Sequence, residues 1–243
     1  MDRAQLNTIL AKEAFVESFR EQSPTRAERA YVLLVSTFLA ILLITNLITT
    51  KYFVIGTIPL TTGALTYPFT FLLSDIISEL YGKRRAKLVV WLGLMVSIFM
   101  AVIIQIANVV PIYEGSPVEQ HTFQLVFSLT PGVVLGSMVA YLVAQFTDIY
   151  LFNFCRRLTK DKHLWLRNNV STLISQLLDT LVFGVIAWTV WSLLDPSNVS
   201  KPVAWSTWYK IIIAEYIFKV LFTLLNTPLV YLGVYATKRW IKA

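Results

Sequence analysis

Charged residues are scarce in this sequence. Asp, Glu, Lys and Arg make up only 14% of the 243 residues, whereas an average soluble domain carries about 25%. Hydrophobic residues make up 56%, and the mean hydropathy is +0.63. This balance excludes an ordinary soluble globular domain and indicates an integral membrane protein.

Cysteine and histidine are almost absent. The single Cys155 excludes an internal disulfide and a cysteine-based metal site. The two histidines, His121 and His163, fall in loops that the topology below places on opposite sides of the membrane. No H-E-x-x-H, G-x-S-x-G or P-loop pattern is present. We therefore expect no enzyme activity, no metal and no other cofactor.

Long apolar runs are missing from the first 29 residues, so we expect no cleavable signal peptide there. Residues 1–29 form a predicted cytoplasmic preface. Its apolar residues fall roughly on one helical face, which is typical of an interfacial amphipathic helix, and an unordered tail is the alternative.

Six apolar segments follow, and they define a transmembrane domain over residues 30–243. Each is near the length of about 20 residues that a helix needs to cross the hydrocarbon core. Pro59, Gly63 and Pro68 interrupt the second segment, so we expect its outer end to be irregular. The predicted fold class is all-α with six transmembrane helices, at about 30–50, 58–80, 87–110, 127–155, 169–194 and 208–237.

The basic residues predict the orientation. Most of the 21 basic residues fall in 1–29, 83–87, 156–167 and 238–242, which six helices would place on one side of the membrane. The loops on the other side carry only Lys51 and Lys201. By the positive-inside rule both termini are cytoplasmic. Topology also accounts for the net charge of +7, so we expect no nucleic-acid partner.

Five acidic residues remain inside the apolar segments: Asp75, Glu79, Asp148, Asp179 and Glu215. A charged side chain at the bilayer centre costs roughly 2.5–3.5 kcal/mol on the insertion scale. Glu79 lies near a helix end, but the other four must face protein or a cavity. Asn or Ser could link helices without this cost, so a function is favoured for the three aspartates. Glu215 precedes Lys219 by four residues, which suits a helical ion pair of either structural or binding role.

Two of these aspartates share a local pattern. The stretches Ala144–Phe152 and Ser175–Phe183 both place Gln, then Asp three residues on, then Phe four further. Two three-helix halves of opposite orientation would suit a transporter built from inverted repeats.

These segments resemble the queuosine precursor transporter family, earlier labelled a vitamin uptake family. The resemblance rests on F-x-F-L-L-S-D-I-I followed by Y-G-K-R-R, then A-Y-L-V-A-Q-x-x-D, S-T-L-I-S-Q-L-L-D-T and E-Y-x-F-K-V. It runs from about Asn46 to Pro228. It implies a bacterial inner-membrane importer of 7-deazaguanine precursors of queuosine, such as 7-cyano-7-deazaguanine, 7-aminomethyl-7-deazaguanine or queuine. The family's polar positions carry over as Asn46, Asp75, Gln145, Asp148, Asp179, Glu215 and Lys219.

The chemistry of such a base suits these residue types. Its N1–H and exocyclic amine match the two oxygens of one carboxylate, and its O6 accepts from an amide or ammonium. Gln176 adds a further amide, and Phe71 and Phe183 offer faces for stacking. We expect Asp75, Asp148 and Asp179 to converge on one cavity walled by Phe71 and Phe183.

Other classes stay open. Six-helix membrane subunits that bind substrate for ATP-driven uptake complexes are one alternative, and a structural or assembly subunit is another. The expected partners are a small-molecule substrate and the lipid bilayer, and the sequence leaves a homodimer open.

Overall fold

The computed structural model describes residue 5 and residues 24–159, 164–194 and 203–242. Most of the predicted preface, 1–29, lies outside the described residues. Its last four residues belong to the first described helix, α2 (Arg26–Ile48). Thr25 begins this helix with a capping box: its hydroxyl accepts from the Glu28 amide at 3.2 Å, and Glu28 accepts from the Thr25 amide at 2.8 Å. The first apolar helix therefore starts before residue 30.

A short β-hairpin follows α2 in an otherwise helical fold and replaces the start of the second predicted helix. Strands β1 (Tyr52–Ile55) and β2 (Ile58–Thr61) pair antiparallel, and Gly56 supplies the positive φ of 64° at the turn. Helix α3 (Gly63–Tyr81) begins directly after β2. The predicted helix at 58–80 thus starts five residues late, consistent with the irregular outer end expected from its prolines and glycine.

The remaining helices follow closely on one another. Gly82, with φ of 85°, turns the chain between α3 and α4 (Lys83–Val109). The short α5 (Gln120–Phe127) precedes α6 (Thr130–Leu158), which has Pro131 in its first turn. The next apolar segment comprises α7 (Leu164–Gly184), the π-helix η1 (Val185–Val190) and α8 (Trp191–Leu194).

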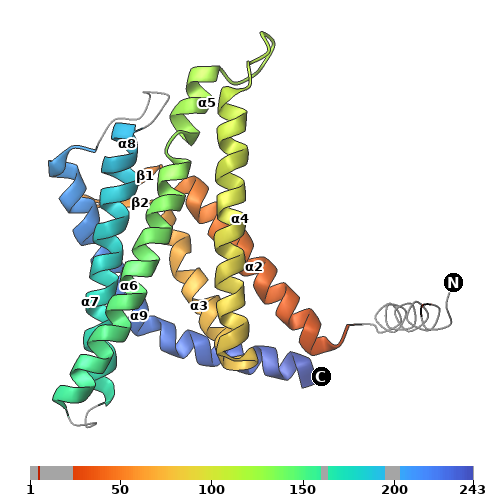
Figure 1. Cartoon of the computed structure of the whole chain (residues 1–243), viewed down its shortest axis with the longest axis vertical. Helices are drawn as coiled ribbons and strands as arrows, with labels where there is room; N and C mark the ends of the chain where they lie inside the picture. Colours follow the sequence, from red (N-terminus) through yellow and green to blue (C-terminus); the bar gives the residue numbers. More distant parts are fainter. Residues whose placement is uncertain (1–4, 6–23, 160–163, 195–202, 243) are drawn as a thin grey trace.

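The last helix, α9 (Trp205–Lys242), is bent. Its parts Trp205–Thr223 and Pro228–Lys242 make an angle of 51°. Pro228 lies inside this helix and lacks the amide hydrogen needed for an i→i−4 bond, which explains a bend there. In Figure 1 the second part crosses the lower end of the bundle.

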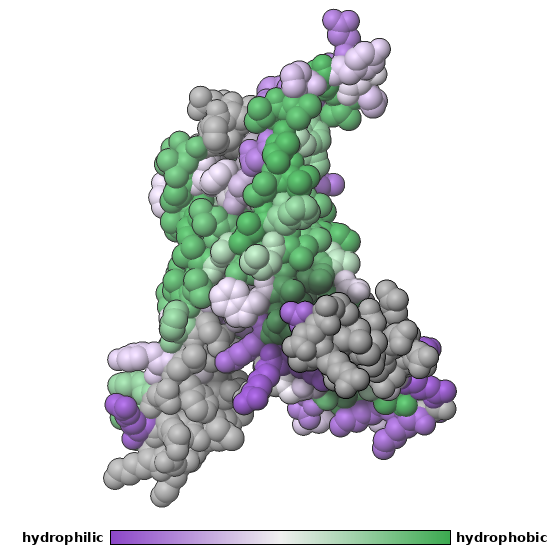
Figure 2. Space-filling model, turned by 45° about the vertical axis from the view of Figure 1, so that its right-hand side comes forward, coloured by the Kyte–Doolittle hydropathy of each residue, from purple (hydrophilic) through white to green (hydrophobic). Residues whose placement is uncertain are grey.

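Four helical stretches of the described residues are long and apolar enough to cross a membrane: Arg26–Ile48, Arg84–Val109, Gln120–Ala144 and Val170–Leu194. The bent α9 makes a fifth if its two parts form one span. Helix α3, which carries Asp75 and Glu79, is not among them, although its 19 residues extend about 28 Å. Figure 2 shows an apolar band between hydrophilic ends. The chain is therefore a polytopic helical membrane protein with four or five candidate spans.

The helices form a bundle whose two ends carry different parts of the chain. The start of α2, the α3–α4 junction, the end of α6 and the end of α9 all lie at the lower end in Figure 1. These are the basic parts of the chain. The hairpin lies in the upper half, near the other end of the bundle.

Two buried apolar clusters hold the bundle together. One joins α2, α3 and α4 through Phe38, Ile77 and Val89. The other joins α6, η1 and α9 through Val133, Ala187, Trp188, Trp208, Ile211 and Ile212. Lipid tails are as apolar as these side chains, so close packing rather than exclusion from water holds such helices together. Each cluster therefore fixes, through its packing, the helices that carry the polar residues described next.

Candidate functional site

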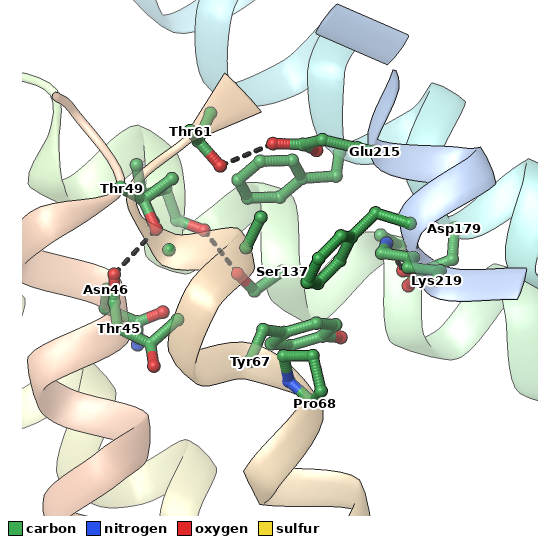
Figure 3. Close-up of a pocket in the computed structure, with 16 residues that line it drawn as sticks. Thr45, Asn46, Thr49, Thr61, Tyr67, Pro68, Ser137, Asp179, Glu215 and Lys219 are labelled. Atoms are coloured by element: carbon green, nitrogen blue, oxygen red, sulfur yellow. Dashed lines mark hydrogen bonds and ion pairs between the residues drawn. The ribbon is translucent and has the colours of Figure 1, made fainter. Parts of the chain in front are cut away.

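A pocket lies where both groups of helices meet the hairpin. The space between its lining atoms, including its open mouth, has a volume of about 570 Å³. The lining comes from α2, β2, α3, α6, α7 and α9, and consists of Thr45, Asn46, Thr49, Thr61, Gly63, Ala64, Tyr67, Pro68, Val133, Ser137, Ala140, Asp179, Phe183, Glu215, Phe218 and Lys219 (Figure 3).

Glu215 of α9 is one of the two acidic residues of the pocket, and it is only 6% exposed. The hydroxyl of Thr61, at the end of β2, donates a hydrogen bond to Glu215 Oε1. Thr61 is itself 2% exposed. The hairpin therefore supplies the hydrogen-bond donor for a carboxylate that the sixth apolar segment brings into the bundle.

Asp179 of α7 forms the second acidic position, and it is paired with Lys219 of α9. Lys219 Nζ lies 2.8 Å from Asp179 Oδ2 and donates to Thr180 Oγ1 at 3.0 Å. Both charged side chains are 14% exposed. The helical ion pair expected between Glu215 and Lys219 is thus replaced by a pair between two helices, because Lys219 reaches across to α7.

Aromatic side chains form a wall beside this ion pair. Lys219 Nζ lies 5.2 Å from the centroid of the Tyr67 ring, a cation–π contact. Phe183, one turn after Asp179 on α7, and Phe218 also line the pocket. Phe183 packs edge-on against Trp188 with ring centroids 5.4 Å apart, so part of the buried core supports this wall.

The opposite wall is polar and uncharged. Thr45 and Asn46 of α2, and Thr49 directly after this helix, are each no more than 5% exposed. Asn46 Nδ2 donates to Ser97 Oγ of α4 at 3.2 Å, and the hydroxyls of Thr45 and Thr66 lie 2.6 Å apart. These contacts hold α2, α3 and α4 around the pocket.

Glycine allows α3 to approach α2 closely at this wall. A Cβ added at Gly63 would collide with Thr49 Oγ1. Any larger side chain at the start of α3 would therefore push the helix away from α2. Gly63 and Thr49 both line the pocket, so its width depends on this contact.

The described pocket side chains carry one more negative than positive charge, because Asp179 and Glu215 face the single ammonium of Lys219. Elsewhere too, the described residues contain no group of three or more His, Cys, Asp or Glu that could hold a metal ion. The chemistry available in the pocket is therefore hydrogen bonding, ion pairing and aromatic stacking.

The predicted site residues divide into three groups. Those that line the pocket are Asn46, Asp179, Phe183, Glu215 and Lys219. Those described elsewhere are Phe71, Asp75 and Gln176; the expected convergence of Asp75 and Phe71 on the cavity is not seen. Those whose side chains are outside the described part are Gln145 and Asp148, which belong to α6.

The residues outside the pocket have other surroundings. Phe71 and Asp75 lie one and two helical turns after Tyr67 on α3, and both side chains are exposed. Gln176 of α7 donates to Thr223 of α9 at 3.0 Å, which links these two helices. A binding role for these three residues stays a prediction.

Sequence reasoning missed several pocket residues. The motifs above do not include Thr61, Tyr67, Ser137 or Phe218, all of which line the pocket. The sequence gives one signal for Thr61: it follows Pro59 in a segment too broken to be a helix, and backbone of that kind lies in the membrane only against protein or a wet cavity. Ser137 and Phe218 carry no such signal.

Apolar helices packed around a buried, charged pocket define the class: a polytopic membrane protein with the construction of a membrane transporter.

A family model described as "Putative vitamin uptake transporter" matches residues 61–233. The chain is 32% identical over 174 residues to the "Probable queuosine precursor transporter" of Bacillus subtilis, covering 70% of each chain. It is 27% identical over 164 residues to the "Queuosine precursor transporter" of Escherichia coli, covering 68% of this chain and 67% of the relative. The chain therefore belongs to the queuosine precursor transporter family. No solved structure was found to match it.

Proposed function

We propose that this protein carries a queuosine precursor, a 7-deazaguanine base, across the bacterial inner membrane into the cytoplasm. The observation that carries the proposal is the Asp179–Lys219 pair within a pocket of aromatic and hydroxyl side chains. The names of the matched relatives support the same substrate class.

The Asp179–Lys219 pair suits the lactam edge of such a base. A 7-deazaguanine presents its N1–H donor next to its O6 acceptor, and the pair presents a carboxylate acceptor next to an ammonium donor. Asp179 accepts from N1–H and Lys219 donates to O6, with both contacts charge-assisted. A base without this edge would displace water from the pair without replacing the hydrogen bonds that the water had made, so it would bind more weakly.

The flat ring of the base stacks against the aromatic wall. Base–aromatic stacking contributes about 1–3 kcal/mol per base in nucleic-acid systems. Tyr67, Phe183 and Phe218 line the pocket near the pair. The neutral wall of α2 then faces the substituent at position 7, where 7-cyano, 7-aminomethyl and larger groups differ.

We propose six transmembrane segments for this carrier, with α3 and α9 added to the four apolar stretches. Both termini are cytoplasmic, because the basic parts of the chain lie at one end of the bundle. Cysteine placed at position 115 should react with an impermeant reagent on intact cells, whereas cysteine at position 85 should not. Labelling of 85 alone would overturn this topology.

Transport by the purified protein tests the function. The protein is reconstituted in liposomes, and uptake of labelled 7-cyano-7-deazaguanine is measured by counterflow against unlabelled base trapped inside. We expect counterflow with the wild type and at least a tenfold loss with Asp179→Asn, since one charge-assisted bond contributes about 1.5–3 kcal/mol. Glu79→Gln, a substitution on α3 outside the pocket lining, is the control and should transport normally. Absence of counterflow by the wild type would refute a solitary carrier.

A further inference from the structure

Among the residues that the structure describes, no cation contacts the carboxylate of Glu215. The only ammonium among the described pocket residues, that of Lys219, is bonded to Asp179 at 2.8 Å and to Thr180 at 3.0 Å. The hydrogen-bond partner of Glu215 is instead the neutral hydroxyl of Thr61. A carboxylate that is 6% exposed thus has a neutral partner where a buried charge ordinarily has a cation.

Within the described part of the chain, the charged and titratable groups around Glu215 come from four elements. On its own helix and on α7 these are Lys219 and Asp179, which interact with it electrostatically. On β1 and α3 they are the phenols of Tyr52 and Tyr67. The described pocket side chains of α2 and α6 are neutral. The pocket therefore holds one carboxylate in excess, and that excess lies at Glu215.

We propose that Glu215 is the proton-carrying residue of the transport cycle, taking up one proton with each neutral base and releasing it in the cytoplasm. The proposal rests on the proposed function, since it assigns a driving force to the same pocket. In this step one proton from the external water adds to a carboxylate oxygen of Glu215, and the same proton later leaves to cytoplasmic water. No other bond forms or breaks.

Displacement of water by the base links the two binding events. An empty pocket open to one side admits water, which solvates an ionised Glu215. A stacked base displaces that water, and an unneutralised carboxylate is then left in a site of low polarity, which is costly. Base binding therefore favours protonation, and by reciprocity protonation favours base binding to the same degree. This mutual coupling is the condition for symport.

Thr61 suits both states of Glu215. Its hydroxyl donates to the ionised carboxylate, and it can accept a hydrogen bond from the carboxylic acid. Thr61 ends the hairpin that connects α2 with α3. The hairpin can therefore keep a hydrogen bond with Glu215 in both protonation states, with the direction of the bond reversed.

Accumulation in liposomes tests the proposal. The membrane potential is clamped at zero with potassium and valinomycin, and a gradient of one pH unit, acid outside, is imposed. One proton per base predicts about tenfold accumulation of labelled 7-cyano-7-deazaguanine inside, since one pH unit supplies the free energy of a tenfold concentration ratio. An uncoupler should return the ratio to one. Counterflow without accumulation would overturn the proposal and leave the proposed function intact, whereas loss of both in the wild type would refute the function itself.

Substitutions then identify the carrier. We expect Glu215→Gln to give no response to the pH gradient, Glu215→Asp to restore part of it, and Glu79→Gln to keep the full response. Accumulation by Glu215→Gln at the wild-type ratio would overturn the assignment. If Glu215→Gln lacks transport altogether, calorimetry of base binding in buffers of different ionisation enthalpy decides: the wild type should take up protons on binding and the variant none. Equal uptake by both would contradict the proposal.

Discussion

The acidic residues of α3 and those of α7 and α9 have different surroundings. Asp75 and Glu79 are exposed and lie outside the pocket lining, whereas Asp179 and Glu215 line the pocket with little exposure. All four occur in apolar stretches, and Asp75 was expected to be as costly in a membrane as Asp179 and Glu215. The difference shows that insertion cost identifies helices with a polar face but does not say which part of that face meets the other helices.

Removal of Lys219 should have the largest effect. Lys219→Met leaves Asp179 buried without its cation, and breaking one side of a buried pair costs about 3–5 kcal/mol. We expect a clearly lower midpoint of thermal unfolding in detergent and no counterflow. The double variant Asp179→Asn with Lys219→Met should recover much of the stability but not the transport. Equal unfolding midpoints of the wild type and Lys219→Met would show that the pair contributes no stability.

Asp179→Asn compared with Asp75→Asn tests the contrast directly. Both substitutions remove one charge and keep the size of the side chain. Affinity for the base, measured by calorimetry, should fall about 10- to 100-fold at Asp179, in line with the loss of a charge-assisted bond, and less than threefold at Asp75. Equal losses at the two positions would show that the α3 carboxylate takes part in binding after all.

Tyr67 and Phe71 extend the comparison to aromatic residues of one helix. Their rings contact each other edge-on at 4.9 Å, but only Tyr67 lines the pocket. Tyr67→Leu should weaken binding about 5- to 30-fold through lost stacking of about 1–2 kcal/mol. Phe71→Leu removes a similar ring one turn away and should change affinity less than twofold. The reverse order would place the stacking face at Phe71.

Much of the architecture could be predicted from the sequence. The apolar segments indicated a polytopic helical membrane protein, which the four or five candidate spans confirm. The basic parts of the chain lie at one end of the bundle (Figure 1), whereas the six spans and the cytoplasmic side of that end stay predictions. The motif positions on α7 and α9 gave Asp179, Phe183, Glu215 and Lys219, all of which line the pocket.

The pairing inside the pocket could not be predicted in the same way. An i, i+4 spacing puts Glu215 and Lys219 on one helix face, but a lysine side chain is long enough to choose a partner on another helix. Asp75 also lies outside the pocket, two helical turns after Tyr67 on α3, and the local sequence of α3 does not encode which of its turns meets the pocket. The hairpin depends on long-range contacts of the same kind, since Thr61 meets a residue 154 positions later.

Among the pocket residues, substitution of Thr61 should change the affinity for the base least. This substitution tests whether the hairpin contributes to binding. Thr61→Val keeps the shape of the side chain and removes the hydroxyl that donates to Glu215. The net contribution of one such bond is about 1 kcal/mol, so affinity for the base should fall about fivefold. Thr61→Ser keeps the hydroxyl and should stay within twofold of the wild type. Thr57→Val, at the exposed turn of the same hairpin, is the matched control and should have no effect. If Thr61→Val and Thr57→Val both bind like the wild type, the hairpin only connects α2 with α3, and Glu215 acts without it.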